Sequence, residues 1–191
     1  VRIGDALCCM ITSGEADAWK ILKDDFLIVV VWKLISETFK LIGKPIISVK
    51  ELMSSLDEKC WKLLADGITC TLNQVDSDWA TELMKKYKAH TVEEGSMFVA
   101  ALRPSFDSWR DMFINREPYS TGSKQLDEVL KSTGGMILFQ ENLMQYFDWL
   151  GITPAESIGL IKKISKKKIH PEDFQKLEER LKAKWVENTG S

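Results

Sequence analysis

The chain has 191 residues, of which 45% are hydrophobic and 28% charged, so it can bury a core and has the composition of a soluble globular protein. Its 26 basic and 28 acidic side chains give a net charge of −2, which excludes a general attraction to nucleic acid and leaves only local basic patches. The four cysteines and two histidines match neither a zinc motif nor a disulfide framework, and we expect a cytoplasmic protein.

The first 45 residues predict strands and helices in alternation. Residues 1–10 suit a strand that contains a Cys-Cys pair, and Ser13 to Trp19 suits a short helix. The β-branched run at 22–31 predicts a buried strand. Apolar spacing from Trp32 to Ile42 predicts a helix, which Gly43-Lys44-Pro45 would end.

The longest apolar run gives no indication of a membrane protein. It extends only from Phe26 to Trp32, which is too short to span a bilayer, and no signal peptide precedes it. Because the first residue is valine, we expect the sequence to be a fragment or a trimmed chain.

The middle of the chain predicts a succession of helices. Asp76-Ser77-Asp78 spells an acidic D-x-D, but it directly precedes a helical pattern and favours a helix start over a metal site. Thr91-Val92-Glu93-Glu94 has the pattern of a capping box. The expected helices are Ser48–Ser55, one capped by Asp57, Trp79–Tyr87, Thr91 to about Leu102, Trp109–Glu117 and Lys124–Lys131.

Three further helices are expected after the turn at Gly134-Gly135. The first runs from Met136 to Leu150, and the second starts at Thr153 with a proline and a glutamate in its first turn. The third starts at Pro171. The residues expected to face inward on the last two helices are Ile158, Leu160, Ile161, Ile164, Phe174, Leu177, Leu181 and Trp185.

The second of these helices ends in a dense group of lysines, which we call the lysine tip. A phosphate-binding role and a solvated helix end, where the helix dipole favours cations, are both consistent with this charge. The seven tryptophans likewise suggest base stacking, although Trp61, Trp149 and Trp185 lie on apolar helix faces and favour core packing. The lysine tip consists of Lys162, Lys163, Lys166, Lys167 and Lys168.

The stretch from Thr133 to Lys168 resembles the fingers of the bacterial DNA polymerase III alpha subunit, a member of the C family of DNA polymerases. That family has a segment of the form T-Y-G-hydrophobic-hydrophobic-Y-Q-E-Q-hydrophobic-M, followed by L-R-R-A-M-G-K-K-K. Phe139-Gln140-Glu141-Asn142 corresponds to the first segment and Leu160 to Lys168 to the second. Ile161-Lys162 replaces the paired arginines, so the charge is kept in part while the bidentate fork is lost.

Two more parts of the chain carry the resemblance to the fingers. Gly67, Thr69, Gln74 and Ser77 match the family's G-D-T-x-G-V-F-Q-x-E-S segment. Ala100-Ala101-Leu102-Arg103-Pro104 is similar to the family's A-L-x-R-P-G element, which implies that Arg103 faces a nucleotide. The alternative for Arg103 is a surface ion pair with a neighbour such as Asp107. Gln140 and Glu141 would line the nucleotide site and orient a basic residue, or else be buried polar groups that satisfy their neighbours.

The resemblance also implies a catalytic carboxylate near the N-terminus. Leu22-Lys23-Asp24-Asp25-Phe26-Leu27 is similar to the palm segment L-V-K-F-D-F-L-G-L. Asp25 would then be a Mg²⁺ ligand, with Lys23 as the cation beside the active site, and the alternative for Asp25 is a carboxylate at a strand entry. The other two palm carboxylates have no counterpart before Asp25, so we expect this piece alone to be inactive.

The order of five similar segments, from about residue 20 onward, implies a mainly α fold. Residues 1–45 would be a palm-like strand and helix, and 46–191 a multi-helix, fingers-like domain. The implied function is part of a template-directed DNA polymerase that binds primer-template DNA and dNTP, uses Mg²⁺ in the intact enzyme, and contacts other replication proteins but no membrane. The alternative is a non-enzymatic helical module, derived from a polymerase, that binds DNA or a replication protein.

Overall fold

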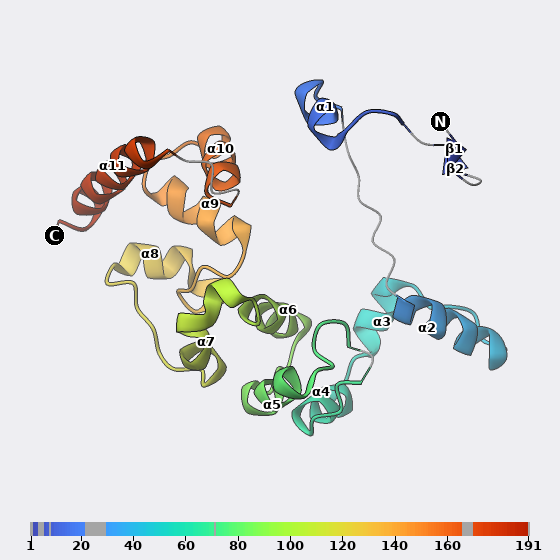
Figure 1. Ribbon diagram of the computed structural model, residues 1–191. Helices are drawn as coiled ribbons and strands as arrows, with labels where there is room; N and C mark the ends of the chain where they lie inside the picture. The colour runs from blue at the N-terminus through green and yellow to red at the C-terminus, as the bar shows by residue number, and fades with distance from the viewer. Residues whose placement is uncertain are drawn as a thin grey trace. The chain divides into compact units, whose positions relative to one another are not determined.

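The structure is a computed structural model that describes residues 2–3, 6–7, 9–21, 30–70, 72–165 and 170–190. The chain divides into two compact units, Val1–Ser48 and Val49–Ser191, which are labelled by element in Figure 1. Helices make up most of the described chain, which confirms the mainly α prediction. Within the described ranges, no helix is both long and apolar enough to cross a membrane.

The first unit contains a hairpin and two helices. β1 (Arg2–Ile3) pairs antiparallel with β2 (Ala6–Leu7), so the single strand expected at 1–10 is instead two short ones. α1 (Ser13–Ala18) is close to its prediction. α2 (Val30–Leu41) begins two residues earlier than expected. The predicted strand at 22–31 is therefore wrong at Val30 and Val31, where the amphipathic pattern outweighs β-branching, and its remainder lies outside the described residues.

The second unit consists of nine α-helices and two short 3₁₀ turns within its described residues. The turns are Pro104–Phe106 and Lys131–Thr133. The helices are α3 (Val49–Ser55), α4 (Glu58–Ala65), α5 (Asp78–Tyr87), α6 (Val92–Ala101), α7 (Asp107–Ile114), α8 (Lys124–Val129), α9 (Gln140–Trp149), α10 (Pro154–Ser165) and α11 (Pro171–Thr189). Every helix expected in this unit is present.

Polar side chains cap the helix starts that the sequence indicated. The Asp57 carboxylate accepts hydrogen bonds from two backbone N–H groups of α4, and the Ser77 hydroxyl accepts one from Ala80. Asp76-Ser77-Asp78 is therefore a helix start, as predicted. The capping box at Thr91 differs from expectation, because the Glu94 carboxylate accepts from the N–H of His90 and not from that of Thr91.

The start of α9 is the largest difference in a helix boundary. The helix begins at Gln140, four residues after the expected Met136. Gly134 and Gly135 both have positive φ, and the Thr133 hydroxyl donates to the backbone oxygen of Met136 at 2.6 Å. This turn holds the segment before Gln140 out of the helix, although its apolar spacing continues the helical pattern.

Two hydrophobic clusters form the core of the second unit. The larger joins α5, α6 and α7, with Tyr87 stacked on Phe113 at a ring-centroid distance of 5.0 Å. The smaller joins α9 and α10 through Phe147, Ile152 and Ile161. An ion pair between Arg180 and Glu156 joins α11 to α10, and a hydrogen bond from the Asn188 amide to the Trp149 carbonyl joins it to α9.

The inner faces of α10 and α11 are narrower than predicted. Ser157 and Ile161, one turn apart, are the buried residues of α10, whereas Ile158 and Ile164 are 43% and 40% exposed. On α11, Phe174 is exposed although Leu177, Leu181 and Trp185 are half-buried. The expectation that all of these apolar residues face inward is wrong for Ile158, Ile164 and Phe174, which flank the packed stripe.

Candidate nucleic-acid interface

Arg103 lies in an extended conformation between the end of α6 and the 3₁₀ turn that Pro104 starts. Its side chain is exposed. The alternative ion pair with Asp107 is not formed, because Asp107 pairs with Arg110 at 2.6 Å between Nη1 and Oδ1. The Arg103 guanidinium makes no ion pair with any residue that the structure describes. It is an exposed cation at a helix end whose backbone is held in place.

Arg110 holds the backbone on which Arg103 sits. Its Nε donates to the Ala101 carbonyl at 3.0 Å and its Nη2 to the Arg103 carbonyl at 3.1 Å, so it satisfies two carbonyls at the end of α6. The side chain is 11% exposed, and its guanidinium lies 5.0 Å from the centre of the Trp79 ring. Sequence reasoning missed Arg110, although the three-residue spacing from Asp107 is a signal for a helical ion pair.

Gln140 and Glu141 occupy the first turn of α9, and both are exposed. The alternative that they are buried polar groups is therefore wrong. Asn142, which sequence reasoning did not select, has that role: it is 4% exposed, and its Oδ1 accepts from the N–H groups of Leu138 at 3.3 Å and Phe139 at 3.0 Å. Asn142 fixes the start of α9 and leaves its two neighbours free to meet a ligand.

Lys162 and Lys163 lie in the last turn of α10 and are exposed. Neither ammonium group pairs with a carboxylate among the described residues. Ile161, the residue before them, is buried in the cluster that also contains Phe147 of α9. Two cations of the lysine tip are thus carried by a helix that packs on α9. Lys166, Lys167 and Lys168 lie outside the described residues.

The catalytic residues suggested by the resemblance, Lys23 and Asp25, also lie outside the described residues. Among the residues that are described, no group of three or more His, Cys, Asp or Glu side chains could hold a metal ion.

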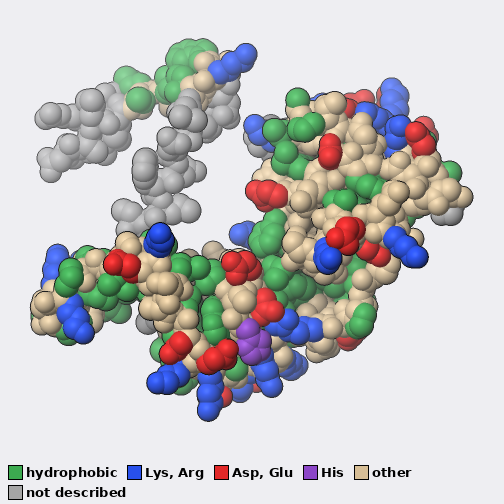
Figure 2. All heavy atoms as spheres, turned by 180° about the vertical axis from the view of Figure 1, so that it is seen from behind, with side chains coloured by type: hydrophobic (Ala, Val, Ile, Leu, Met, Phe, Trp, Pro, Cys, Tyr) green, Lys and Arg blue, Asp and Glu red, His purple; other side chains and the backbone are tan. Residues whose placement is uncertain are grey.

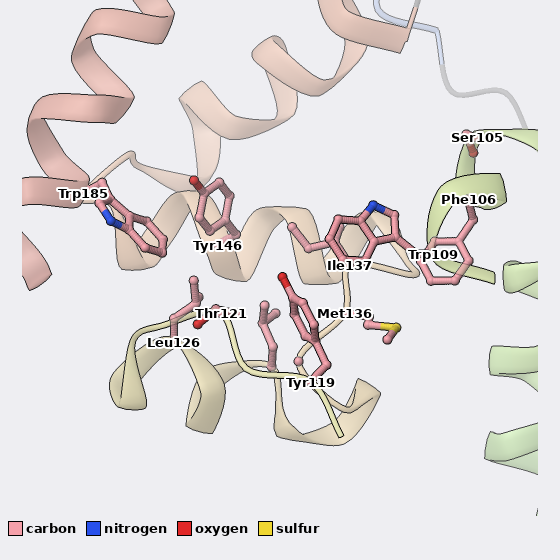
Figure 3. A pocket seen from close by; sticks show the side chains of 12 residues that line it. Ser105, Phe106, Trp109, Tyr119, Thr121, Leu126, Met136, Ile137, Tyr146 and Trp185 are labelled. Carbon is pink, nitrogen blue, oxygen red and sulfur yellow. The ribbon is translucent and has the colours of Figure 1, made fainter. Parts of the chain in front are cut away.

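A cavity of about 400 Å³ connects two of the predicted site segments (Figure 3). Ser105 and Phe106, just after Arg103, form part of its lining, and so does Ile137, three residues before Gln140. The 3₁₀ turn after Arg103 and the segment before Gln140 therefore border the same cavity, although neither Arg103 nor Gln140 lines it. On the face drawn in Figure 2, basic and acidic side chains are mixed. An anion would therefore be attracted by individual basic side chains and not by this face as a whole.

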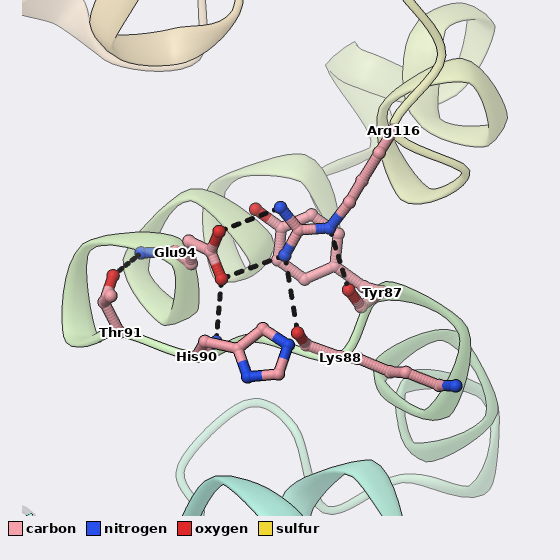
Figure 4. Close-up of polar contacts among 6 residues, drawn as sticks. All are labelled: Tyr87, Lys88, His90, Thr91, Glu94 and Arg116. Carbon is pink, nitrogen blue, oxygen red and sulfur yellow. Dashed lines mark hydrogen bonds and ion pairs between the residues drawn. The ribbon is translucent and has the colours of Figure 1, made fainter. Parts of the chain in front are cut away.

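A separate polar cluster joins α5 and α6 to the segment that follows α7 (Figure 4). The Arg116 guanidinium makes two hydrogen bonds with Glu94, at 2.8 and 2.9 Å, and its Nε donates to the Tyr87 carbonyl at 3.1 Å. Hydrogen bonding to Arg116 lowers the pKa of Glu94, and burial raises the pKa of Tyr87 to about 12. Sequence reasoning missed this cluster, whose partners lie 22 or more residues apart.

The geometry defines a mainly helical domain with exposed cations at the ends of α6 and α10 that make no ion pair among the residues described. The sequence model of the bacterial DNA polymerase III alpha subunit finger domain matches residues 32–189. The chain therefore belongs to the bacterial DNA polymerase III alpha subunit family, within which it corresponds to the finger domain.

Individual relatives agree with this assignment. The chain is similar to the DNA polymerase III alpha subunit of Caulobacter vibrioides, with 32% identity over 126 residues, 63% of this chain and 11% of the relative. It is also similar to the alpha subunit of Helicobacter pylori, with 30% identity over 175 residues, 87% of this chain and 14% of the relative. The matched region is thus a small part of each relative's length.

Proposed function

We propose that this chain supplies the fingers of a template-directed DNA polymerase, where it binds the incoming dNTP and the primer-template. The observation that carries the proposal is the Arg103 guanidinium, which has no described ion-pair partner and projects from a backbone fixed by Arg110. A guanidinium on a rigid support suits bidentate binding of a phosphate. Family membership supports the same assignment.

In this proposal the cations act together on the triphosphate and the DNA backbone. Lys162 and Lys163 supply point charges at the end of α10, and Lys166, Lys167 and Lys168 extend them. Gln140 and Glu141, exposed at the start of α9, orient one of the basic side chains by hydrogen bonding. Cations gathered around a phosphate would stabilise its charge.

The proposal places the nucleotidyl transfer itself in the intact polymerase. Residues 1–45 would belong to the palm and 46–191 to the fingers. In the intact enzyme Mg²⁺ would be held by palm carboxylates, to which Asp25 contributes one, with Lys23 beside it. The isolated chain is expected to be inactive as a polymerase, and the intact protein to act in the cytoplasm with other replication proteins.

Calorimetric titration of the chain with dATP tests the phosphate-binding part of the proposal. We expect Arg103→Ala to weaken binding roughly 10-fold or more, because a hydrogen bond to a charged group contributes about 1.5–3 kcal/mol. The double change Lys162→Ala, Lys163→Ala should also weaken it. Lys86→Ala removes an exposed lysine from α5 and serves as a matched control that leaves affinity unchanged. Equal affinity in all four proteins would refute the proposal.

A further inference from the structure

A larger cavity lies elsewhere in the second unit, among α4, α5 and α6, which are labelled in Figure 1. Its walls come from these helices and from the segment 68–75 that connects α4 to α5. The volume is about 720 Å³, within the range of roughly 300–1,000 Å³ typical of small-molecule sites. It shares no lining residue with the cavity of Figure 3.

The lining of this cavity is mainly aliphatic and carries no charge. Leucine, isoleucine, valine and methionine side chains form most of it, and Trp61 is the one aromatic residue among the described lining residues. None of these residues is an acid or a base. A charged ligand would therefore lose its hydration here without gaining an ion pair, whereas an alkyl chain would find matching walls.

The cavity has two polar side chains that the protein does not use. Asn73 and Ser96 are both exposed, so they lie where the lining meets solvent. Neither side chain makes a hydrogen bond with a residue in the described part of the chain. A ligand with one uncharged polar end could therefore exchange hydrogen bonds with the Asn73 amide or the Ser96 hydroxyl.

Gly95 leaves space on the α6 side of the cavity. It lies inside α6, its φ is not in the left-handed region, and a Cβ atom there would meet no heavy atom within 4 Å. Neither the backbone nor the packing of the chain therefore requires glycine at this position, although glycine is a poor helix former. The missing side chain leaves room that a ligand can fill.

The segment after α4 leaves apolar surface in contact with water. Leu63 and Ile68 line the cavity and are 48% and 51% exposed. Asn73 stands where the family's G-D-T-x-G-V-F-Q-x-E-S segment has phenylalanine, so a large apolar side chain is absent from this wall. Covering this surface would provide a hydrophobic driving force for binding.

We propose that this cavity binds a neutral small molecule with an alkyl chain and one uncharged polar end. The alkyl chain lies against the aliphatic walls and occupies the space beside Gly95, and the polar end meets Asn73 and Ser96. The site uses none of the cations assigned to phosphate, so the inference does not depend on the proposed function.

Fluorescence of Nile red tests the inference, because this neutral dye becomes bright in apolar surroundings. We expect the chain to bind the dye and n-decanol to displace it. Decanoate has the same chain length but carries a carboxylate, and it should compete at least roughly 10-fold less well because the lining offers no cation. Absence of dye binding, or equal competition by decanol and decanoate, overturns the inference.

Gly95→Leu locates the binding, because the new side chain fills the cavity from α6. Each methylene group that can no longer be buried weakens binding roughly fourfold, so decanol should bind roughly 10-fold or more weakly. Leucine is the better helix former, and circular dichroism verifies that the variant folds. Gly159→Leu is the matched control, since Gly159 is an exposed glycine of α10 with equally open surroundings. Equal affinity in Gly95→Leu and Gly159→Leu overturns the inference.

Cys60 gives a second readout that does not use the dye. Its half-buried thiol lines the cavity, whereas Cys9 is exposed in the first unit. Bound n-decanol should slow the alkylation of Cys60 by N-ethylmaleimide and leave the alkylation of Cys9 unchanged, as measured by mass spectrometry of the peptides. Alkylation of Cys60 at the same rate with and without decanol overturns the assignment of the ligand to this cavity.

Discussion

Arg103 and Arg110 are seven residues apart, yet their guanidinium groups have opposite surroundings. Arg110 is 11% exposed and donates to two carbonyls at the end of α6, whereas Arg103 is exposed and has no ion pair among the described residues. A side chain with several fixed partners contributes to stability, and one without partners is available for binding. We therefore assign Arg110 to positioning, and our proposal gives Arg103 the contact with the ligand.

This division of roles predicts different effects on stability. Arg110→Ala should lower the free energy of unfolding by about 1–3 kcal/mol, because it leaves the carbonyls of Ala101 and Arg103 without their partner. Arg103→Ala should change it by less than about 0.5 kcal/mol, as expected for an exposed side chain. Urea unfolding followed by circular dichroism measures both, and equal losses in the two variants would contradict the assignment.

The Glu94–Arg116 pair predicts a dependence of stability on pH. Arg116 lowers the pKa of Glu94 below its ordinary value of 4.5 in the folded state. The stabilising contribution of Glu94 is therefore complete above pH 4.5 and declines as the pH falls through the lower folded-state pKa. Glu94→Gln should cost about 1–2 kcal/mol at pH 7 and much less at pH 3.

Urea unfolding of wild type and Glu94→Gln at several pH values measures this difference. Glu93→Gln is the matched control, because Glu93 is the neighbouring acid of the same helix turn and its side chain makes no described hydrogen bond with Arg116. A penalty for Glu94→Gln that is as large at pH 3 as at pH 7 would show that the ionised carboxylate is not what stabilises this junction.

At the scale of single residues, local patterns predicted more than long-range ones did. The position of Arg103 followed from Pro104, which disfavours the helical conformation in the residue before it, and the structure confirms that α6 ends before Arg103. Arg116 was missed because its partners lie on α5 and α6, far away in sequence. No periodicity or spacing rule relates such residues, so only the folded chain reveals them.

At the scale of elements, capping residues predicted helix starts well and apolar spacing predicted them poorly. Ser77 fixes the start of α5 through a local hydrogen bond that the sequence displays directly. The apolar spacing from Met136 onward extended the expected α9 too far, because the glycine turn and Asn142 define its true start. The residues of α10 that are buried are those that pack against α9 and α11. The sequence of α10 alone therefore does not predict its buried face.

Asn142 gives an element-scale prediction. Asn142→Ala should destabilise the chain by about 1–2 kcal/mol, since the N–H groups of Leu138 and Phe139 lose their acceptor. Asn142→Asp keeps an acceptor at the positive end of α9 and should retain most of the stability. Thermal unfolding compares the two variants, and the account of this cap fails if Asp is as damaging as Ala.

At the scale of the whole molecule, the evidence is strongest for family membership and the helical fold. The finger-domain match covers residues 32–189, and the helices within it leave cations at the ends of α6 and α10. The net charge of −2 means that any attraction to DNA comes from these local groups and not from the chain as a whole. The salt dependence of binding is therefore the most informative property.

The measurement that tests the central claim most directly is fluorescence anisotropy of a labelled primer-template, titrated with the chain over a range of salt concentrations. We predict that log K falls steeply with log salt, with a slope of about −0.9 per phosphate contact, and that Lys166→Ala, Lys167→Ala, Lys168→Ala flattens it by the loss of a few contacts. Lys86→Ala should leave the slope unchanged. Absence of binding, or a slope that is the same in the triple variant, would contradict the claim that the lysine tip contacts phosphate.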